Sequence, residues 1–418
     1  MHVQRLGGGA SPQAVLRGLH RRAQRLGVPG PAALTGQWFG SAAVLAPSVE
    51  VTPCDPSAAF PPTGPTPGPA GAIGGGWIGY LAYPDGAGAA LAPAAGGWTS
   101  CVLRLDTGGT WWFESLTGES CPAELAAVVR AGAPEQAWAV RWHAPDAAAH
   151  QHRVRQCRAA IAEGEVYQAC VCTRFTGALA GEAVQLFTAG VHAQDPARAA
   201  YLAGDWGAVV SFSPELFLAR HDRVVSSSPI KGTLPAHRSA TDLRASAKDV
   251  AENVMIVDLV RNDLGRVCRP GSITVPDLLA VHPAPGVWHL VSTVRGELRP
   301  DVTDAELLAA TFPPASVTGT PKGRARQLLA GWEDGARGIY CGTVGMVSPV
   351  AGLELNVAIR TVAVAADGAV ELGVGGGITI DSDPAAEWQE CLDKAAATTG
   401  LSPSTPLAPQ SRAASTAS

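Results

Sequence analysis

The strand and helix patterns between about residues 150 and 400 do not alternate, and this order constrains the fold more than any other feature of the sequence. Strand patterns are found at 207–212, 215–219, 223–227, 339–347, 355–365 and 369–375. A parallel α/β sheet requires a regular alternation of strands and helices, which this order does not provide. We therefore expect an α+β fold of large, mainly antiparallel sheets flanked by helices.

The N-terminal third differs from the rest of the chain in its secondary-structure pattern. It contains a helical stretch from Pro12 to Leu26 and a glycine-rich turn that runs into an aromatic strand at 74–83. Near residue 150 a helix at about 147–163 precedes a buried strand, Val166 to Phe175. We divide the chain into regions 1–145 and 146–400 and expect one interleaved globular unit, because 74–83 has the pattern of a core strand. The tail 402–418 contains little that it could bury, so we expect it to be disordered.

Composition excludes several classes of function. A formal charge of −5 and a pI near 6.1 give no electrostatic basis for binding nucleic acid or an anionic membrane. The nine cysteines lack a C-x-x-C pair, which favours free thiols in a reducing compartment. The segment Met1 to Gly9 has no apolar signal core, and no apolar run has membrane-spanning length. We expect a soluble, cytoplasmic protein.

One rare lysine stands out as a candidate for chemistry. The chain has 31 lysines and arginines, of which only four are lysines: Lys231, Lys248, Lys322 and Lys394. Arginine keeps its proton at biological pH, whereas a desolvated lysine can lose it and become an amine nucleophile. Lys231 lies in Pro-Ile-Lys-Gly-Thr, so it is either such a nucleophile or a lysine at a strand-to-turn junction that points to water.

Two predicted helices each carry a pair of acids three residues apart. Asp249 and Glu252 lie in the helical stretch 246–264, and Glu387 and Glu390 follow the helix start at Asp383-Pro384. Residues at this spacing project from one side of a helix. The pairs are either solvated polar faces or, if the helices converge, carboxylates for Mg²⁺, which favours one or two carboxylates with water and substrate oxygens.

Three further polar residues need a partner or a role. Arg360 lies in the predicted strand 355–365, where an inward guanidinium needs a carboxylate or a similar group. Ser316 belongs to a hydroxyl-rich loop that opens onto a helix, a place that favours anions. His289 has apolar neighbours, so it is either a hydrogen-bonded core histidine or an acid–base residue.

The ordered series of motifs resembles the chorismate-utilising enzymes, which include anthranilate, aminodeoxychorismate, isochorismate and salicylate synthases. The resemblance covers about 150–400, and residues 74–83 also look like the N-terminal part of the amine-forming members. The matching segments are Tyr167-Gln168, Ser213-Pro214-Glu215, Pro229–Thr233, Ala251–Gly265, Ser316–Lys322, Tyr340-Cys341-Gly342, Ile359-Arg360-Thr361 and Gly375–Ile378, together with the last acid pair. It implies an anthranilate synthase component I-like fold with a chorismate-binding catalytic domain at 146–400.

The resemblance also implies roles for individual residues. Lys231, His289 and Glu252 match catalytic positions, with His289 near the C4 hydroxyl that must leave. Glu252 and Glu390 match the ligands of a Mg²⁺ cofactor, with Asp249 and Glu387 beside them. The implied contacts to the chorismate dianion are Arg360 and Tyr340 at the enolpyruvyl carboxylate, and Ser316, Gln168, Lys394 and the backbone of Gly376 and Gly377 elsewhere.

Two positions select a branch of the family. The branches that add water resemble one another in having a lysine base where this chain has Gln168, and anthranilate synthases resemble Pro-Ile-Ala-Gly-Thr where it has Lys231. The lysine form is similar to aminodeoxychorismate synthase component I. This implies amination of chorismate at C4 to 4-amino-4-deoxychorismate, for p-aminobenzoate and folate, with ammonia from a separate glutamine amidotransferase subunit. The alternatives are an anthranilate synthase component I, which aminates C2 with loss of pyruvate, and a non-catalytic chorismate-binding subunit.

Overall fold

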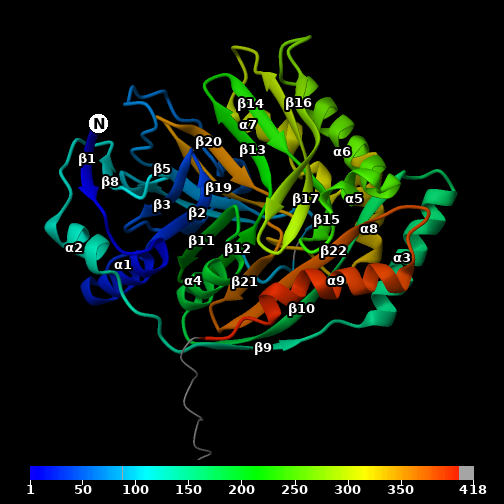
Figure 1. Cartoon of the computed structure of the whole chain (residues 1–418), viewed down its shortest axis with the longest axis horizontal. Helices are drawn as coiled ribbons and strands as arrows, with labels where there is room; N and C mark the ends of the chain where they lie inside the picture. The colour runs from blue at the N-terminus through cyan, green and yellow to red at the C-terminus, as the bar shows by residue number, and fades with distance from the viewer. Residues whose placement is uncertain (87, 404–418) are drawn as a thin grey trace, which may run out of the picture.

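Two large antiparallel sheets form the centre of the molecule (Figure 1). The computed structural model describes residues 1–86 and 88–403. Most of the tail for which disorder is predicted, residues 404–418, lies outside this range. Every strand pairing in the described part is antiparallel, and the expected α+β class is confirmed.

The first sheet has twelve strands in the described part of the chain. In spatial order they are β1 (His2–Gly7), β8 (Trp111–Ser115), β7 (Cys101–Asp106), β3 (Ser41–Ala46), β2 (Ala32–Trp38), β11 (Arg198–Gly204), β12 (Gly207–Ser213), β21 (Thr361–Ala365), β22 (Ala369–Ile378), β10 (Gln168–Ala180) and β18 (Gly319–Thr320), with β9 (Ala139–His143) also on β10.

The second sheet has ten strands within the same described ranges. Their order is β15 (Ile230–Pro235), β17 (Val287–Glu297), β14 (Val224–Ser228), β13 (Leu216–His221), β20 (Gly352–Asn356), β19 (Thr343–Ser348), β5 (Gly76–Leu81), β6 (Ala94–Thr99) and β4 (Thr52–Pro53), with β16 (Thr274–Ala284) on β17.

The N-terminal third contributes strands to both sheets. Strand β5 pairs with β19, and β2 pairs with β11, so each sheet joins the two halves of the sequence. The interleaving expected from residues 74–83 is therefore present, although the boundary near residue 145 stays a prediction.

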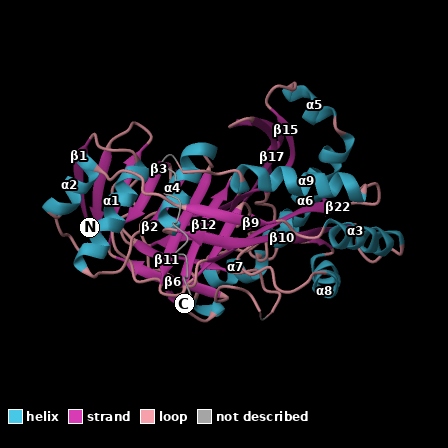
Figure 2. Cartoon of the chain, turned by 90° about the horizontal axis from the view of Figure 1, so that it is seen from below, coloured by secondary structure: helices cyan, strands magenta, loops and turns pink. Residues whose placement is uncertain are grey.

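Helices cover the outer faces and gather at two ends (Figures 1 and 2). At the end that carries the N-terminus lie α1 (Pro12–Leu26) and α2 (Ala123–Ala131). The remaining helices are α3 (Ala147–Ala162), α4 (Ala183–Gln194), α5 (Ala240–Ala245), α6 (Ala247–Gly265), α7 (Asp304–Thr311), α8 (Lys322–Trp332) and α9 (Pro384–Thr399). None of the described helices is both long and apolar enough to cross a membrane.

Local sequence explains where these helices begin. The side chain of Ser246 accepts a hydrogen bond from the Asp249 amide at the start of α6, and Asp383 accepts two amides at the start of α9. Such caps satisfy amides that have no partner within the helix. The predicted starts of both acid-bearing helices are correct.

Strand alternation divides the core into layers. In β2 the side chain of Ala33 packs into the cluster beneath α1 and α4, whereas Ala32 and Leu34 join the cluster between the two sheets. Ile78 and Met346 of the second sheet fill the same inter-sheet layer. Successive residues of a strand face opposite sides, so both faces of the central strands are buried.

The prediction of a single strand at 355–365 is wrong, because the segment is divided between two strands. It forms the end of β20 and the whole of β21, which belong to different sheets. Arg360 lies between them with a φ of 50°, in the left-handed region that interrupts a strand. The strand predicted at 339–347 likewise begins only at Thr343, because Tyr340 and Cys341 form a turn.

Candidate active site

The glycine run at the end of β22 lies between the two acid-bearing helices. A Cβ atom added at Gly377 would lie 2.8 Å from Glu252 Oε1 of α6 and 3.1 Å from Lys231 Nζ of β15. One added at Gly376 would lie 3.0 Å from Glu387 Oε2 and 3.7 Å from Glu390 Oε1 of α9. The missing side chains leave room for these polar groups to approach the backbone.

The convergence that spacing alone left open is thus present in the structure. We call Lys231, Lys248, Lys394, Glu252, Glu387 and Glu390 the lysine–glutamate cluster. Its members come from β15, α6 and α9, elements that lie in the same half of the molecule (Figure 1).

Two ion pairs organise the α9 side of the cluster. Lys394 Nζ donates to Glu390 Oε1 at 2.7 Å and to the Gly375 carbonyl at 2.8 Å. Glu387 Oε1 accepts from Ser382 Oγ at 2.6 Å and from Lys248 Nζ at 3.2 Å. Burial opposes ionisation of Glu390, but the lysines, Lys394 first, hold its pKa below the ordinary value.

The unpaired oxygens of the cluster suit a hard cation. Glu252 Oε1 and Glu387 Oε2 are buried and have no hydrogen-bond partner among the described residues. Buried carboxylate oxygens without donors are costly unless a cation neutralises them. No three or more acidic, histidine or cysteine side chains in the described ranges are gathered closely enough to hold a metal ion by themselves. The donor set therefore fits Mg²⁺ only in the form that shares its shell with substrate or water oxygens.

Asp249 has a different neighbour from the three glutamates. Its Cβ lies 3.1 Å from the position of a Cβ added at Gly232, whose φ is 94°. Asp249 therefore packs against the irregular stretch of β15 directly after Lys231, and Gly232 provides the close approach.

Glu215 is a site residue to which the sequence analysis gave no role. It is buried just before β13, and its Oε1 accepts from Ser316 Oγ at 2.6 Å. Burial raises its pKa from 4.5 to about 7, against the opposing effects of Ser316, Lys231 and Arg360. The sequence places Glu215 in the motif Ser213-Pro214-Glu215 but indicates no role for it. Nothing in the neighbouring residues distinguishes a buried glutamate beside a strand from one on the surface.

The guanidinium of Arg360 has no hydrogen bond or ion pair with a carboxylate among the described residues. Burial lowers its pKa, and the charge of Glu215 acts in the opposite direction. Ser316 and Glu215 are joined by a hydrogen bond, and Lys231 and Arg360 lie close enough to affect the pKa of Glu215.

His289 is buried on β17, directly opposite Thr233 of β15. Its Nδ1 lies 2.9 Å from Thr233 Oγ1, and its Nε2 is buried with no hydrogen-bond partner in the described part of the chain. Burial, and then the charge of Arg360, lower its pKa to about 4. The imidazole is therefore neutral near pH 7, with one nitrogen free to exchange a proton with a ligand.

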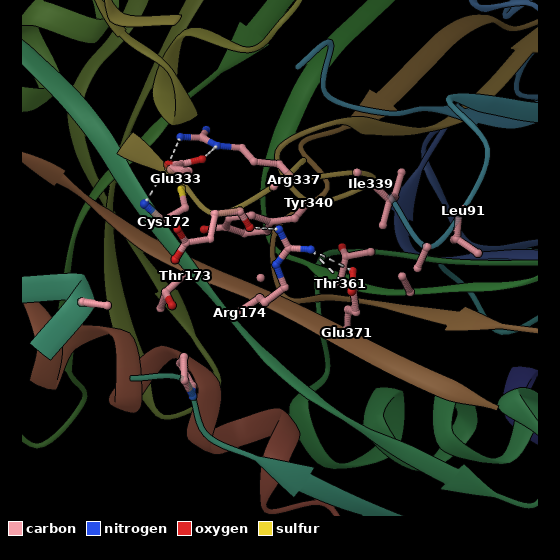
Figure 3. Close-up of a pocket in the computed structure, with 18 of the residues that line it drawn as sticks. Leu91, Cys172, Thr173, Arg174, Glu333, Arg337, Ile339, Tyr340, Thr361 and Glu371 are labelled. Atoms are coloured by element: carbon pink, nitrogen blue, oxygen red, sulfur yellow. Dashed lines mark hydrogen bonds and ion pairs between the residues drawn. The ribbon is translucent and has the colours of Figure 1, made fainter. Parts of the chain in front are cut away.

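Tyr340 lies apart from the glutamates, against the glycine at the other end of the run. Its ring carbon Cγ lies 2.2 Å from the position of a Cβ added at Gly373. Beside it is a cavity of about 200 Å³, whose wall includes Cys172, Arg174, Glu333 and Arg337 (Figure 3). No hydrogen bond joins Tyr340 to Arg360 among the described residues, and both lie beside strands β21 and β22.

Gln168 is buried at the start of β10, where it pairs with Thr320 of β18. Its Oε1 has no hydrogen-bond partner among the described residues. The next residue, Ala169, pairs with Ile378, directly after the two glycines. Gln168 is thus placed near the end of the glycine run with an oxygen free to accept a hydrogen bond.

Comparison with known proteins identifies the family. The family model described as chorismate binding enzyme matches residues 117–400. Aminodeoxychorismate synthase component 1 of Klebsiella aerogenes is 41% identical over 249 residues, which cover 58% of this chain and 55% of that protein. Anthranilate synthase component 1 of Streptomyces coelicolor is 38% identical over 254 residues, covering 59% and 49%. The matches thus span about half the length of these curated relatives.

Solved structures show the same fold over nearly the whole chain. Anthranilate synthase component I from Streptococcus pneumoniae TIGR4 superposes with a TM-score of 0.72 at 23% identity, covering 89% of this chain and 90% of that one. The menaquinone-specific isochorismate synthase MenF of Escherichia coli gives 0.71 at 19% identity, covering 96% and 94%. The fold is therefore anthranilate synthase component I-like, as expected, and the chain belongs to the family of chorismate binding enzymes.

Proposed function

We propose that this enzyme aminates chorismate at C4 and gives 4-amino-4-deoxychorismate, the reaction of an aminodeoxychorismate synthase component I. The observation that carries the proposal is the position of Lys231, whose amine lies beside Gly377 and Glu252 in the lysine–glutamate cluster. An amine held next to a substrate-binding backbone is placed to act as a nucleophile. Several relatives, including those of Klebsiella aerogenes and Escherichia coli K12, are named aminodeoxychorismate synthase component 1.

Gln168 supports amination over hydration. A glutamine side chain cannot deprotonate water, because it has no basic group at neutral pH. Its free Oε1 can instead accept a hydrogen bond from an amine or a hydroxyl group of the substrate.

The proposed chemistry uses Lys231 twice. Its neutral amine forms a bond to ring C2 while the ring double bonds shift and the C4–O bond breaks, and a proton supplied to that oxygen lets it leave as water. Ammonia then forms a bond to C4, the double bonds shift back, and the C2–N bond breaks to return the free lysine. Both steps are substitutions, so no oxidant or reductant is required.

Two buried groups of this chain can manage the protons. Glu215 has a pKa of about 7, so near neutral pH it can accept the proton that Lys231 must lose. His289 is neutral, so its imidazole N–H can donate a hydrogen bond to the departing C4 oxygen, while the proton that this oxygen takes up balances the one that the attacking amine gives up. Arg360 supplies a fixed positive charge for a substrate carboxylate.

We further propose that Glu252, Glu387 and Glu390 hold Mg²⁺, with Asp249 beside them. The ion, when bound, neutralises the ring carboxylate of chorismate and withdraws charge from the ring. The two unpartnered oxygens, Glu252 Oε1 and Glu387 Oε2, support this assignment. Lys394 keeps Glu390 ionised and therefore available as a ligand.

The partner and the pathway belong to the same proposal. Relatives named component 1 imply a second component, and we propose a glutamine amidotransferase that supplies ammonia in the cytoplasm. The product would then enter p-aminobenzoate and folate synthesis.

The test incubates the pure chain with chorismate, Mg²⁺ and ammonium at alkaline pH, with product separation by chromatography. We expect 4-amino-4-deoxychorismate. Anthranilate would instead support the C2-aminating alternative, and no turnover would support a non-catalytic chorismate-binding subunit.

A second experiment addresses the lysine directly. Without ammonia, mass spectrometry should find a chorismate-derived adduct on the peptide that carries Lys231. The matched control is Lys231→Arg, which keeps the positive charge but cannot act as a nucleophile, and it should show neither adduct nor turnover. Amination by the arginine variant would remove the covalent step from the mechanism.

A further inference from the structure

The lysine–glutamate cluster contains as many lysines as glutamates. Two of its three carboxylates already have a lysine partner without a metal ion: Glu387 pairs with Lys248, and Glu390 pairs with Lys394. A divalent cation placed among these carboxylates adds two positive charges beside the lysines that already pair with them. The added charge is unfavourable at such short range unless a like charge leaves or an anion enters.

Lys248 is the cation of this cluster that is best able to leave. Its side chain is 48% exposed, whereas that of Glu387, its partner, is 3% exposed. The ammonium group therefore reaches Glu387 from the solvent side and can return to water at little cost, on a flexible four-carbon stem. The buried carboxylate has no such freedom.

The other two lysines of the cluster are less suited to leave, because Lys394 has two hydrogen-bond partners and Lys231 is the proposed nucleophile. Lys394 has two partners, Glu390 Oε1 and the Gly375 carbonyl, at 2.7 and 2.8 Å. Lys231 lies beside Gly377 on the other side of the cluster. Lys248 has a single hydrogen bond, the 3.2 Å contact with Glu387.

Lys248 also faces more than one of the proposed metal ligands. It stands four residues before Glu252 on α6, so the two side chains lie on one face of that helix. Glu387, Glu252 and Glu390 all act electrostatically on its ammonium group. A cation shared by these carboxylates would therefore meet Lys248 at close range.

We propose that the Lys248 ammonium is the resident counter-ion of Glu387, and that a divalent cation displaces it into solvent on binding. The inference rests on the metal site of the proposed function. The pair between Lys248 and Glu387 is the only direct ion pair between the described parts of α6 and α9. When the metal ion replaces Lys248, glutamates of both helices share that ion, so the helices remain linked with and without metal. Lys248 thereby lowers the affinity of the site for metal in the absence of substrate.

The first experiment measures Mn²⁺ binding to the full chain without chorismate, from the electron paramagnetic resonance signal of free Mn²⁺. Lys248→Met should bind Mn²⁺ about tenfold more tightly than the wild type, because no ammonium has to be displaced. Lys248→Arg should stay close to the wild type. Arg22→Met is the matched control, since it removes a cation from a 3.3 Å pair with Glu124 at the opposite end of the molecule, and it should not change the affinity.

The second experiment uses the unaltered protein. Acetylation of Lys248, followed by mass spectrometry, should become several-fold faster at saturating Mg²⁺, since the amine is released to water, while Lys394 should not change. The proposal is refuted if Lys248→Met binds Mn²⁺ no more tightly than the wild type, if neither protein binds Mn²⁺, or if Mg²⁺ leaves the acetylation rate of Lys248 unchanged. Neither readout depends on turnover, so a chain that failed to aminate chorismate could still pass both tests.

Discussion

Replacement of Glu215 by glutamine tests whether this buried carboxyl is poised near neutral pH. The folded chain holds its pKa at about 7, against an ordinary value of 4.5. Folding therefore favours the protonated form. The stability that this form contributes is complete below about pH 4.5 and is lost as the pH rises through about 7. The difference corresponds to about 3 kcal/mol of unfolding free energy once Glu215 is fully ionised.

Glutamine has the same shape, carries no charge and can still accept a hydrogen bond from Ser316. Its free-energy difference from the wild type should therefore depend on pH. Between about pH 5.5 and about pH 8.5, Glu215→Gln should gain about 2 kcal/mol of stability relative to the wild type. Urea unfolding of both proteins at the two pH values measures this gain, and shifts of histidines common to both proteins cancel in the comparison.

Glu114→Gln serves as the matched control. Glu114 is a fully buried glutamate that Arg104 and the amides of Ile73 and Gly74 already satisfy, and it lies on β8 of the first sheet, whereas Glu215 precedes β13 of the second. Its replacement removes a buried carboxylate from these bonds and shows how much of any change comes from exchanging a buried glutamate for glutamine as such. In the amination assay, Glu215→Gln should lower kcat by about 10² to 10⁴, the usual contribution of an acid–base group. A stability difference for Glu215→Gln that is the same at both pH values would refute the assigned pKa.

Three further outcomes are expected. Gly377→Ala should lower amination about 100-fold, because its Cβ would lie 2.8 Å from Glu252 Oε1 and displace that carboxylate; circular dichroism should show an intact fold, and near-normal turnover would contradict the assigned geometry. Arg337→Met should lower the free energy of unfolding by about 3–5 kcal/mol in urea titrations, because it leaves Glu333 buried without its two 2.7 Å bonds; a smaller loss would mean that the pair contributes little. Mg²⁺ at about 100 times its Kd should stabilise the wild type by about 2.7 kcal/mol in thermal unfolding, and Glu252→Gln should abolish most of that gain.

Local signals in the sequence predicted the elements that carry the site. Asp383 with Pro384 predicted the start of α9, because a cap depends only on residues within one turn, and helical periodicity predicted α6. Helix α1 has the predicted bounds, Pro12 to Leu26. The lack of regular strand–helix alternation predicted the antiparallel α+β class. Consecutive strands that are joined by short connections have few ways to pair other than antiparallel with each other.

Arg360 shows where local reasoning stopped. Its neighbours have the β pattern on both sides, so the sequence indicates one strand through 355–365. The chain instead crosses from one sheet to the other at this residue, with a φ of 50° that only the surrounding packing can maintain. The same crossing brings Arg360 close enough to Glu215 for the two charges to interact, and no local pattern reveals the burial of Glu215.

The sequence by itself determined the fold class, the acid pairs and the rarity of Lys231, because composition, caps and periodicity are properties of neighbouring residues. Only the tertiary structure decided that Glu252 of the first acid pair and both members of the second converge on Gly376 and Gly377. It also decided that Lys248 reaches a carboxylate 139 residues away in the chain. Such contacts depend on how two sheets and their helices pack together, and that long-range packing leaves no period or spacing in the sequence from which it could be read.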